Sequence, residues 1–329
     1  MATTNKVAIP GICLTVMALA ALPAAAAEGA YPSKPIRLIV PFAPGGGTDM
    51  VARVIAPKMT ERLGTSVIVD NRGGAGAIIG TAMAAKAAPD GYTLLVCDTA
   101  HTIQPALQKL EYDPIKSFSL IASLVVGDSM LAAPANLPAN TIQQFIALAK
   151  QKPGQLVAGT AGAGSSGHMA LELFRVMAGI DLIMVHYKGA GAATIDLLGG
   201  TVQISNITIQ AAVPHIKTGR IKALGVGGLK RSAVLPDVPT VAESGLAGYQ
   251  STGWRGLLGP AGLPAPITAR LTREIKAILT SDEVKTHFLN NAMEIDYRDP
   301  QQFKVFIADE MKRWSVLVKK ANISLDARK

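Results

Sequence analysis

The sequence predicts an α/β fold with two lobes, each a mainly parallel sheet flanked by helices, and two chain crossings at a hinge between them. From residue 34 onward, apolar runs of strand length alternate with longer helix-like segments, the pattern of a parallel sheet covered by helices. The alternation restarts after an extended apolar stretch at residues 118–134. The chain beyond residue 252 has no new glycine-rich turn, so we expect it to return to the first lobe, as in a hinged clamp.

The first lobe begins with an apolar strand at residues 36–40. This strand runs into the turn Pro-Phe-Ala-Pro-Gly-Gly-Gly-Thr-Asp and then into a helix with apolar residues on one side. Thr48 or Asp49 is expected to cap that helix, because short polar side chains accept the first free amides. Pro57 lies inside it and is expected to kink it or to delay its regular part.

Two more strands follow in the first lobe. The strand at residues 66–70 leads through a glycine-rich turn into an alanine-rich helix at residues 78–87. The strand at residues 92–97 ends in Asp-Thr-Ala-His-Thr, residues 98–102. Open α/β sheets bind ligands at the carboxyl ends of their strands, so we expect this segment to supply ligand groups.

The second lobe repeats the cycle of strand, glycine-rich turn and helix. Its strands are expected at residues 155–159, 182–187, 202–207 and 222–226, and its helices at residues 142–150, 168–178 and 192–198. The chain crosses back near residues 252–264, and helices expected at 266–280 and 301–320 pack on the first lobe. This assigns residues 28–128 plus 252–329 to the first lobe and residues 129–251 to the second.

The first 27 residues are predicted to be a secretory signal peptide. Lys6 is their one charge, residues 7–22 are almost wholly apolar, and alanines after Pro23 offer a cleavage site near Ala27. An uncleaved anchor helix is the alternative. Cleavage leaves Cys97 as the one cysteine, which excludes an internal disulfide and a cysteine-ligated metal centre within one chain.

The charge balance favours anionic partners. The 329 residues contain 32 Lys and Arg against 23 Asp and Glu, and removing the signal peptide takes one lysine from the formal net charge of +9, leaving +8. Aromatic residues make up only 5% and no run of Lys and Arg is present, so nucleic acid is not expected as a partner. Beyond the signal peptide, Pro, Gly, Asn and Gln interrupt every uncharged stretch, which argues against a membrane span.

Two glycine-rich turns between a strand and a helix are predicted to bind an anion. Their backbone N–H groups approach a ligand closely, and the helix N-terminus adds a partial positive charge. Residues 44–49 contain three successive glycines, and a tight turn requiring positive φ is the structural alternative there. Residues 162–167 match the dinucleotide pattern G-x-G-x-x-G, but the next strand ends in His-Tyr-Lys instead of an acid, and the two serines suit a small anion. Dinucleotide binding is therefore disfavoured.

The histidines do not indicate a metal site or a hydrolase. His101, His168, His186 and His215 lack metal-ligand spacing and lack acidic neighbours in the sequence. Ser165 is followed by His168 on the same expected helix, where the imidazole does not serve as its base, and no G-x-S-x-G motif occurs. We expect no metal, no cofactor and no catalytic residue.

Two further side chains have open roles. Lys188, at the end of a predicted strand, either brings a cation to the cleft or lies in solvent. Trp254, in the return crossing, either lines the cleft or packs at the hinge.

The opening of the mature chain, YPSKPIRLIVPFAPGGGTD at residues 31–49, resembles that of the Bug-type substrate-binding proteins of tripartite tricarboxylate transporters. The resemblance covers the whole mature chain. Further segments resemble family motifs in family order: residues 71–76, 88–95, 112–114, 187–189, 196–200, 235–240 and 260–262.

The resemblance implies a monomeric periplasmic clamp that closes on a small carboxylate and hands it to a two-component membrane permease. In such proteins two glycine-rich turns hold one carboxylate head through backbone groups and ordered water, and side chains from both lobes read the other end. The residues expected to bind the ligand are Phe42, Pro44, Gly45, Gly46, Gly47, Thr48, Asp49, Thr99, His101, Gly162, Gly164, Ser165, Ser166, His168, Lys188 and Asn206.

Two departures from the family pattern bear on the ligand. His186 stands where the family usually has proline, and Asn206 stands near the position of a frequent aspartate. An aspartate there suits an amine, so we expect a ligand without an ammonium group: a di- or tricarboxylate or an aromatic acid. The alternatives are a carboxylate sensor for signalling and a periplasmic enzyme acting on a carboxylate, with His101 or His168 as its candidate base.

Overall fold

The computed structural model describes residues 1–4, 31–320 and 323. The expected signal peptide, apart from its first four residues, lies outside this range, as does its cleavage site near Ala27. Within the described residues, no helix is both long and apolar enough to cross a membrane.

Ten strands of the described chain form one mixed sheet. The strands are β1 (Ile36–Val40), β2 (Val67–Asn71), β3 (Thr93–Asp98), β4 (Phe118–Pro134), β5 (Val157–Thr160), β6 (Ile183–His186), β7 (Ile204–Thr208), β8 (Ile221–Val226), β9 (Thr252–Pro260) and β10 (Met293–Arg298). Their order is β2-β1-β3-β9-β4-β7-β5-β6, and β8 and β10 also pair with β4. Each half contains a parallel unit, β2-β1-β3 or β6-β5-β7.

The sheet is less parallel than the sequence predicts because of β4 and β9. Both strands run antiparallel to all their neighbours. Up to Asp128, β4 pairs with β9, and from Ser129 it pairs with β7 and β8. The partners of β4 thus change beside the position where the sequence suggests a lobe boundary, and the lobe division itself stays a prediction.

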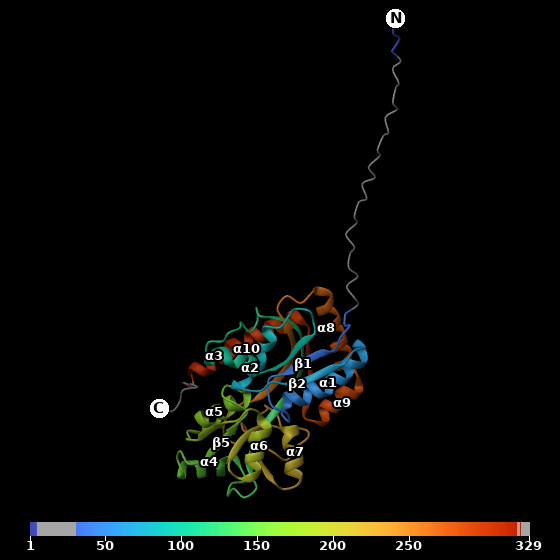
Figure 1. Cartoon of the computed structure of the whole chain (residues 1–329). Helices are drawn as coiled ribbons and strands as arrows, with labels where there is room; N and C mark the ends of the chain where they lie inside the picture. Colours follow the sequence, from blue (N-terminus) through green and yellow to red (C-terminus); the bar gives the residue numbers. More distant parts are fainter. Residues whose placement is uncertain (5–30, 321–322, 324–329) are drawn as a thin grey trace. The chain divides into compact units, whose positions relative to one another are not determined.

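The helices cover the two halves of the sheet separately. They are α1 (Gly47–Leu63), α2 (Ile78–Ala85), α3 (Ala100–Leu107), α4 (Ile142–Gln151), α5 (Ser166–Ala178), α6 (Ala190–Gly199), α7 (Ile209–Lys217), α8 (Ala265–Thr280), α9 (Asp282–Asn290) and α10 (Pro300–Lys320), with a short 3-10 turn at Ala75–Ala77. Figure 1 shows α1 and α9 near β1 and β2, and α4, α5 and α6 around β5. As expected, the C-terminal helices pack on the first half, since α8 contacts α1 and α10 contacts α3.

The expected strands and helices are confirmed to within two residues at either end, but the sequence patterns do not predict α3, α7, α9, β9 and β10. At β9 they indicate a return crossing near residues 252–264 and not a strand. Pro105 lies inside α3 and Pro214 inside α7, and a proline in the sequence argues against a helix.

Helix α1 is continuous through Pro57. Its N-cap is Gly46, without a side-chain cap, so neither Thr48 nor Asp49 takes the expected capping position.

Trp254 belongs to the core of the first half. Its ring meets Phe303 and Phe306 edge to face, with centroid separations of 5.7 and 5.4 Å. The ring therefore packs in this core, and the hinge-packing alternative stays a prediction. Side chains alternate along a strand, so the next residue of β9, Arg255, points to the opposite face.

Candidate ligand-binding site

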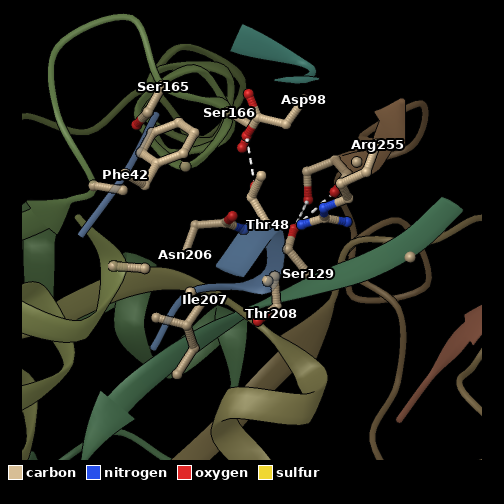
Figure 2. A pocket seen from close by; sticks show the side chains of 18 residues that line it. Phe42, Thr48, Asp98, Ser129, Ser165, Ser166, Asn206, Ile207, Thr208 and Arg255 are labelled. Atoms are coloured by element: carbon tan, nitrogen blue, oxygen red, sulfur yellow. Dashed lines mark hydrogen bonds between the residues drawn. The ribbon is translucent and has the colours of Figure 1, made fainter. Parts of the chain in front are cut away.

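A pocket of about 610 Å³, including its open mouth, lies where the N-termini of α1 and α5 meet the ends of several strands. Figure 2 shows it from close by. It is lined by Phe42, Gly46, Gly47, Thr48, Asp98, Gly127, Ser129, Ala161, Ser165, Ser166, Gly167, Ala190, Asn206, Ile207, Thr208, Ser251, Gly253 and Arg255.

The first glycine-rich turn presents the uncapped N-terminus of α1 to this pocket. The first bond inside the helix runs from the Met50 amide to the Gly46 carbonyl at 3.0 Å, so the amides of residues 47–49 have no acceptor within the helix. Asp49 holds the turn from behind: its carboxylate accepts hydrogen bonds from the Gly45 amide at 3.0 Å and from Asn71 and Arg53 at 2.9 Å. Burial raises the pKa of Asp49, but the bonds from Arg53, Gly45 and Asn71 outweigh it and leave the pKa below its usual value.

The second glycine-rich turn is held by its own side chains. Ser165 is the N-cap of α5, and its Oγ accepts a hydrogen bond from the His168 amide at 3.2 Å. The Gly164 amide donates to Nδ1 of His168 at 3.0 Å, which requires a neutral imidazole. Burial lowers the pKa of His168 to about 4, which keeps it neutral. Gly162 and Gly164 take φ values of +135° and +71°, so the glycines permit the turn.

The charged side chains that line the pocket are those of Asp98 and Arg255. They are directly opposite each other in the β3–β9 pairing. Asp98 accepts hydrogen bonds from the Ala100 amide at 3.0 Å and from Thr48 Oγ1 at 3.4 Å (Figure 2). Burial raises the pKa of Asp98 to about 6, although the positive charge of Arg255 opposes the shift.

The polar atoms that lack a partner in this pocket are mostly hydrogen-bond donors. Nε and Nη1 of Arg255 and Nδ2 of Asn206 are buried without a hydrogen-bond partner among the described residues. Gln210 has both its amide atoms unpartnered beside Gly47, where a Cβ would lie 2.8 Å from Nε2. Since buried donors without acceptors are costly, this arrangement favours a ligand rich in acceptor oxygens. Within the described chain, no group of three or more His, Cys, Asp or Glu could hold a metal ion.

The structure brings together seven of the sixteen residues expected from the sequence. Phe42, Gly46, Gly47, Thr48, Ser165, Ser166 and Asn206 line the pocket. Pro44, Gly45, Asp49, Gly162, Gly164 and His168 belong to the two turns without lining the pocket. Lys188 is exposed, and its carbonyl accepts a hydrogen bond from the Ala43 amide at 3.3 Å. The binding role of all these residues stays a prediction.

Thr99 and His101 do not line the pocket. Thr99 Oγ1 accepts a hydrogen bond from the Trp254 amide at 3.0 Å. His101 is 2% exposed, its Nε2 lies 2.8 Å from the Pro114 carbonyl, and its ring packs edge to face on Phe118. Both follow β3 as expected, but helix α3 begins at Ala100 and turns His101 toward the core.

The residues that the sequence interpretation missed come mainly from β4 and β9. Arg255 is the one charged residue of β9, and a lone charge in an otherwise apolar strand is a signal for a site. Asp98 opens the polar segment expected to supply ligand groups, yet it is absent from the expected binding residues. Ser129 and Thr208 carry no signal in the sequence, because only the pairing of β4 with β7 places them beside the pocket.

Known proteins resemble this chain over nearly its whole length. The model of the tripartite tricarboxylate transporter family receptor, TctC, matches residues 51–323. Protein BugT of Bordetella pertussis is 36% identical over 328 residues, which cover 99% of this chain and 100% of BugT. MatC from Rhodopseudomonas palustris with bound malate shares 33% identity with a TM-score of 0.84, covering 88% of this chain and 100% of MatC. R. palustris Rpa4515 with adipate shares 32% identity with a TM-score of 0.86, covering 89% and 99% of the two chains.

These comparisons confirm both the family resemblance and the two-lobed α/β clamp predicted from the sequence. The family match at residues 51–323 includes the lining residues from Asp98 to Arg255, whereas Phe42, Gly46, Gly47 and Thr48 precede it. The chain therefore belongs to the tripartite tricarboxylate transporter receptor family and is a periplasmic solute-binding protein of the Bug type.

Proposed function

We propose that this protein captures a small carboxylate in the pocket and presents it to the membrane permease of a tripartite tricarboxylate-type transporter. The supporting observation is the excess of hydrogen-bond donors without partners: the amides at the uncapped N-terminus of α1, the guanidinium of Arg255 and the amide of Asn206. Helix N-termini favour anions, and a carboxylate supplies acceptor oxygens to several donors at once.

The ligand we propose is a di- or tricarboxylate or an aromatic acid without an ammonium group. Asp98 is the one acid among the described lining residues, and Arg255 lies opposite it, so the pocket offers an ammonium group no uncompensated negative charge. Malate in MatC and adipate in Rpa4515 are carboxylates of this kind bound by related proteins.

Export to the periplasm after cleavage near Ala27, and action as a monomer, are parts of the same proposal. Closure of the clamp on its ligand gives a permease a state to recognise, because a ligand that prefers one conformer shifts the population toward it. The same closure serves a sensor of carboxylates, and deletion of the permease separates the two roles: transport stops, whereas a sensor's transcriptional response continues.

We propose no catalytic activity. The two histidines considered as bases have other roles in the structure, since His101 contacts the Pro114 carbonyl and Nδ1 of His168 accepts the Gly164 amide. Neither lines the pocket. Chemical conversion of a bound acid by the purified protein, followed by NMR, would contradict this part of the proposal.

A thermal-shift screen tests the proposal directly. Protein purified from periplasmic extract, after removal of carried-over ligand by partial unfolding and refolding, is tested with mono-, di- and tricarboxylates, aromatic acids and amino acids. A ligand at about one hundred times its Kd stabilises the native state by about 2.7 kcal/mol, which is easily measured. We expect a shift with one class of carboxylates, and no shift with any anion would refute the proposed function.

A further inference from the structure

Arg255 is fixed in the pocket without the partner that a buried cation normally has. Its residue is 4% exposed, and Nε and Nη1 make no hydrogen bond to any described residue. Asp98, the nearest acid, acts on the guanidinium through space and forms no ion pair with it within 4.0 Å, although their strand positions are directly opposite. A buried arginine that lacks hydrogen-bond partners destabilises the ligand-free protein unless something else supplies an acceptor.

Three glycines shape the space around this guanidinium. A Cβ on Gly47 would lie 2.6 Å from Nη2, and Cβ atoms on Gly253 and Gly127 would lie 3.4 and 3.5 Å from Nη1. All three glycines line the pocket. A side chain on Gly47 would collide with the guanidinium, so the glycine allows Arg255 to lie against the turn at the start of α1.

The other donors gather on a second side of the pocket. The N-terminus of α5 lies there with Ser165 and Ser166, and a Cβ on Gly167 would lie 3.1 Å from the backbone carbonyl of Asn206. The Asn206 side chain, whose Nδ2 has no partner among the described residues, lies beside Thr48 in Figure 2. Figure 2 shows Ser165 and Arg255 on opposite sides, with Thr48 between them. The pocket thus presents Arg255 on one side and the α5 turn on the other, and a ligand with two carboxylates can meet both.

We propose that Arg255 is a specificity-determining residue that binds a second carboxylate of the ligand, at the opposite side of the pocket from the α5 turn. This inference rests on the proposed capture of a carboxylate. It narrows the ligand to acids with two carboxylates, because an aromatic monoacid leaves the guanidinium unpaired. Arginine suits this role because its fork of N–H donors matches the two oxygens of a carboxylate.

Calorimetric titration of dicarboxylates and their monoamides tests this role. The protein from periplasmic extract is titrated with succinate, malate and adipate, and with the monoamide of each, which keeps the shape and removes one charge. Loss of a charge-assisted hydrogen bond lowers affinity roughly ten- to hundredfold. We expect wild type to prefer the dicarboxylate by this factor, Arg255→Gln to bring the ratio near one without weakening monoamide binding, and Arg255→Lys to retain part of the preference.

The control is Arg313→Gln, which removes the same charge from the surface of α10, where Arg313 pairs with Glu310. This substitution is expected to leave the affinity for the dicarboxylate and the affinity for the monoamide unchanged. Equal weakening of both ligands by Arg255→Gln, or equal affinity of wild type for both, would overturn the role of Arg255. If Arg255→Gln does not fold, the test uses the ratio of dicarboxylate to monoamide affinity in Arg255→Lys. A ratio equal to that of wild type would overturn the role of Arg255. Failure of the folded wild type to bind any carboxylate removes the proposed function itself, whereas tight monoamide binding removes only this inference.

Discussion

Gly76→Ala is expected to weaken ligand binding without touching the pocket. Gly76 lies in the short turn after β2, with φ +59°, and a Cβ there would overlap the Ala163 carbonyl and Nε2 of Gln104. Gln104 joins the two segments, because Nε2 donates hydrogen bonds of 2.9 Å to the carbonyls of both Gly76 and Ala163. On the proposed lobe division, Gly76 and Ala163 belong to different lobes, so the added methyl group pushes the lobes apart.

The expected loss of ligand affinity equals the free energy of the contacts that only the closed form makes. The left-handed backbone costs a non-glycine residue about 1–2 kcal/mol, but this strain affects the open and the closed form alike. Gln104 and Gly76 belong to the same lobe on this division, so only the bond from Gln104 to the Ala163 carbonyl depends on closure, and it contributes about 0.5–1.5 kcal/mol. Its loss therefore lowers ligand affinity by about 0.5–1.5 kcal/mol, or roughly two- to thirteenfold.

Calorimetry with the carboxylate that gives the largest thermal shift measures this loss, and small-angle scattering shows whether the liganded variant stays more extended than wild type. Gly219→Ala is the matched control. Gly219 has φ +66°, and a Cβ added there would meet no atom within 4 Å, so its substitution carries the backbone strain without the overlap. It should lower stability and leave affinity unchanged. Wild-type affinity in Gly76→Ala would refute the argument that these two segments must approach for binding.

Three further predictions concern Asp98, which lines the pocket, and His101, which does not. Because the pKa of Asp98 is raised to about 6, its carboxyl group is protonated at lower pH, so a carboxylate ligand should bind more tightly as pH falls from about 8 to about 5.5. Asp98→Asn should flatten this profile in titrations across that range, and a profile unchanged by the substitution would contradict the assignment. The same shift makes folding stability fall as pH rises from 3.8 to about 6, since the folded state then holds the proton more tightly than the unfolded state. His101→Ala should lower the free energy of unfolding by about 2–4 kcal/mol in urea titrations and leave ligand affinity within about twofold, because its buried ring packs in the core. Weaker binding at unchanged stability would instead place His101 in the site.

Local pattern accounts for most of the fold. Apolar runs set β1, β3 and the long β4, and glycine-rich turns mark the starts of α1 and α5. Helix α3 is not predicted because Pro105 interrupts its pattern, and β10 is not predicted because its alternating charges resemble a solvated surface segment. In both cases packing against distant parts of the chain, α10 for α3 and β4 for β10, stabilises an element that local propensity does not favour.

The α/β class and the two glycine-rich turns follow from residues that are neighbours along the chain, and so do the predictions of an export signal and of anion binding at those turns. Which side chains meet those turns depends on the tertiary structure. Arg255 reaches the pocket through the antiparallel pairing of β9 with β3, which joins residues 157 positions apart at Asp98 and Arg255. The direction of a side chain at a strand end, as with His101 and Asp98, depends on where the next helix begins. The register of the strands and the direction in which helix side chains point depend on burial of the whole core, so a local sequence pattern does not predict them.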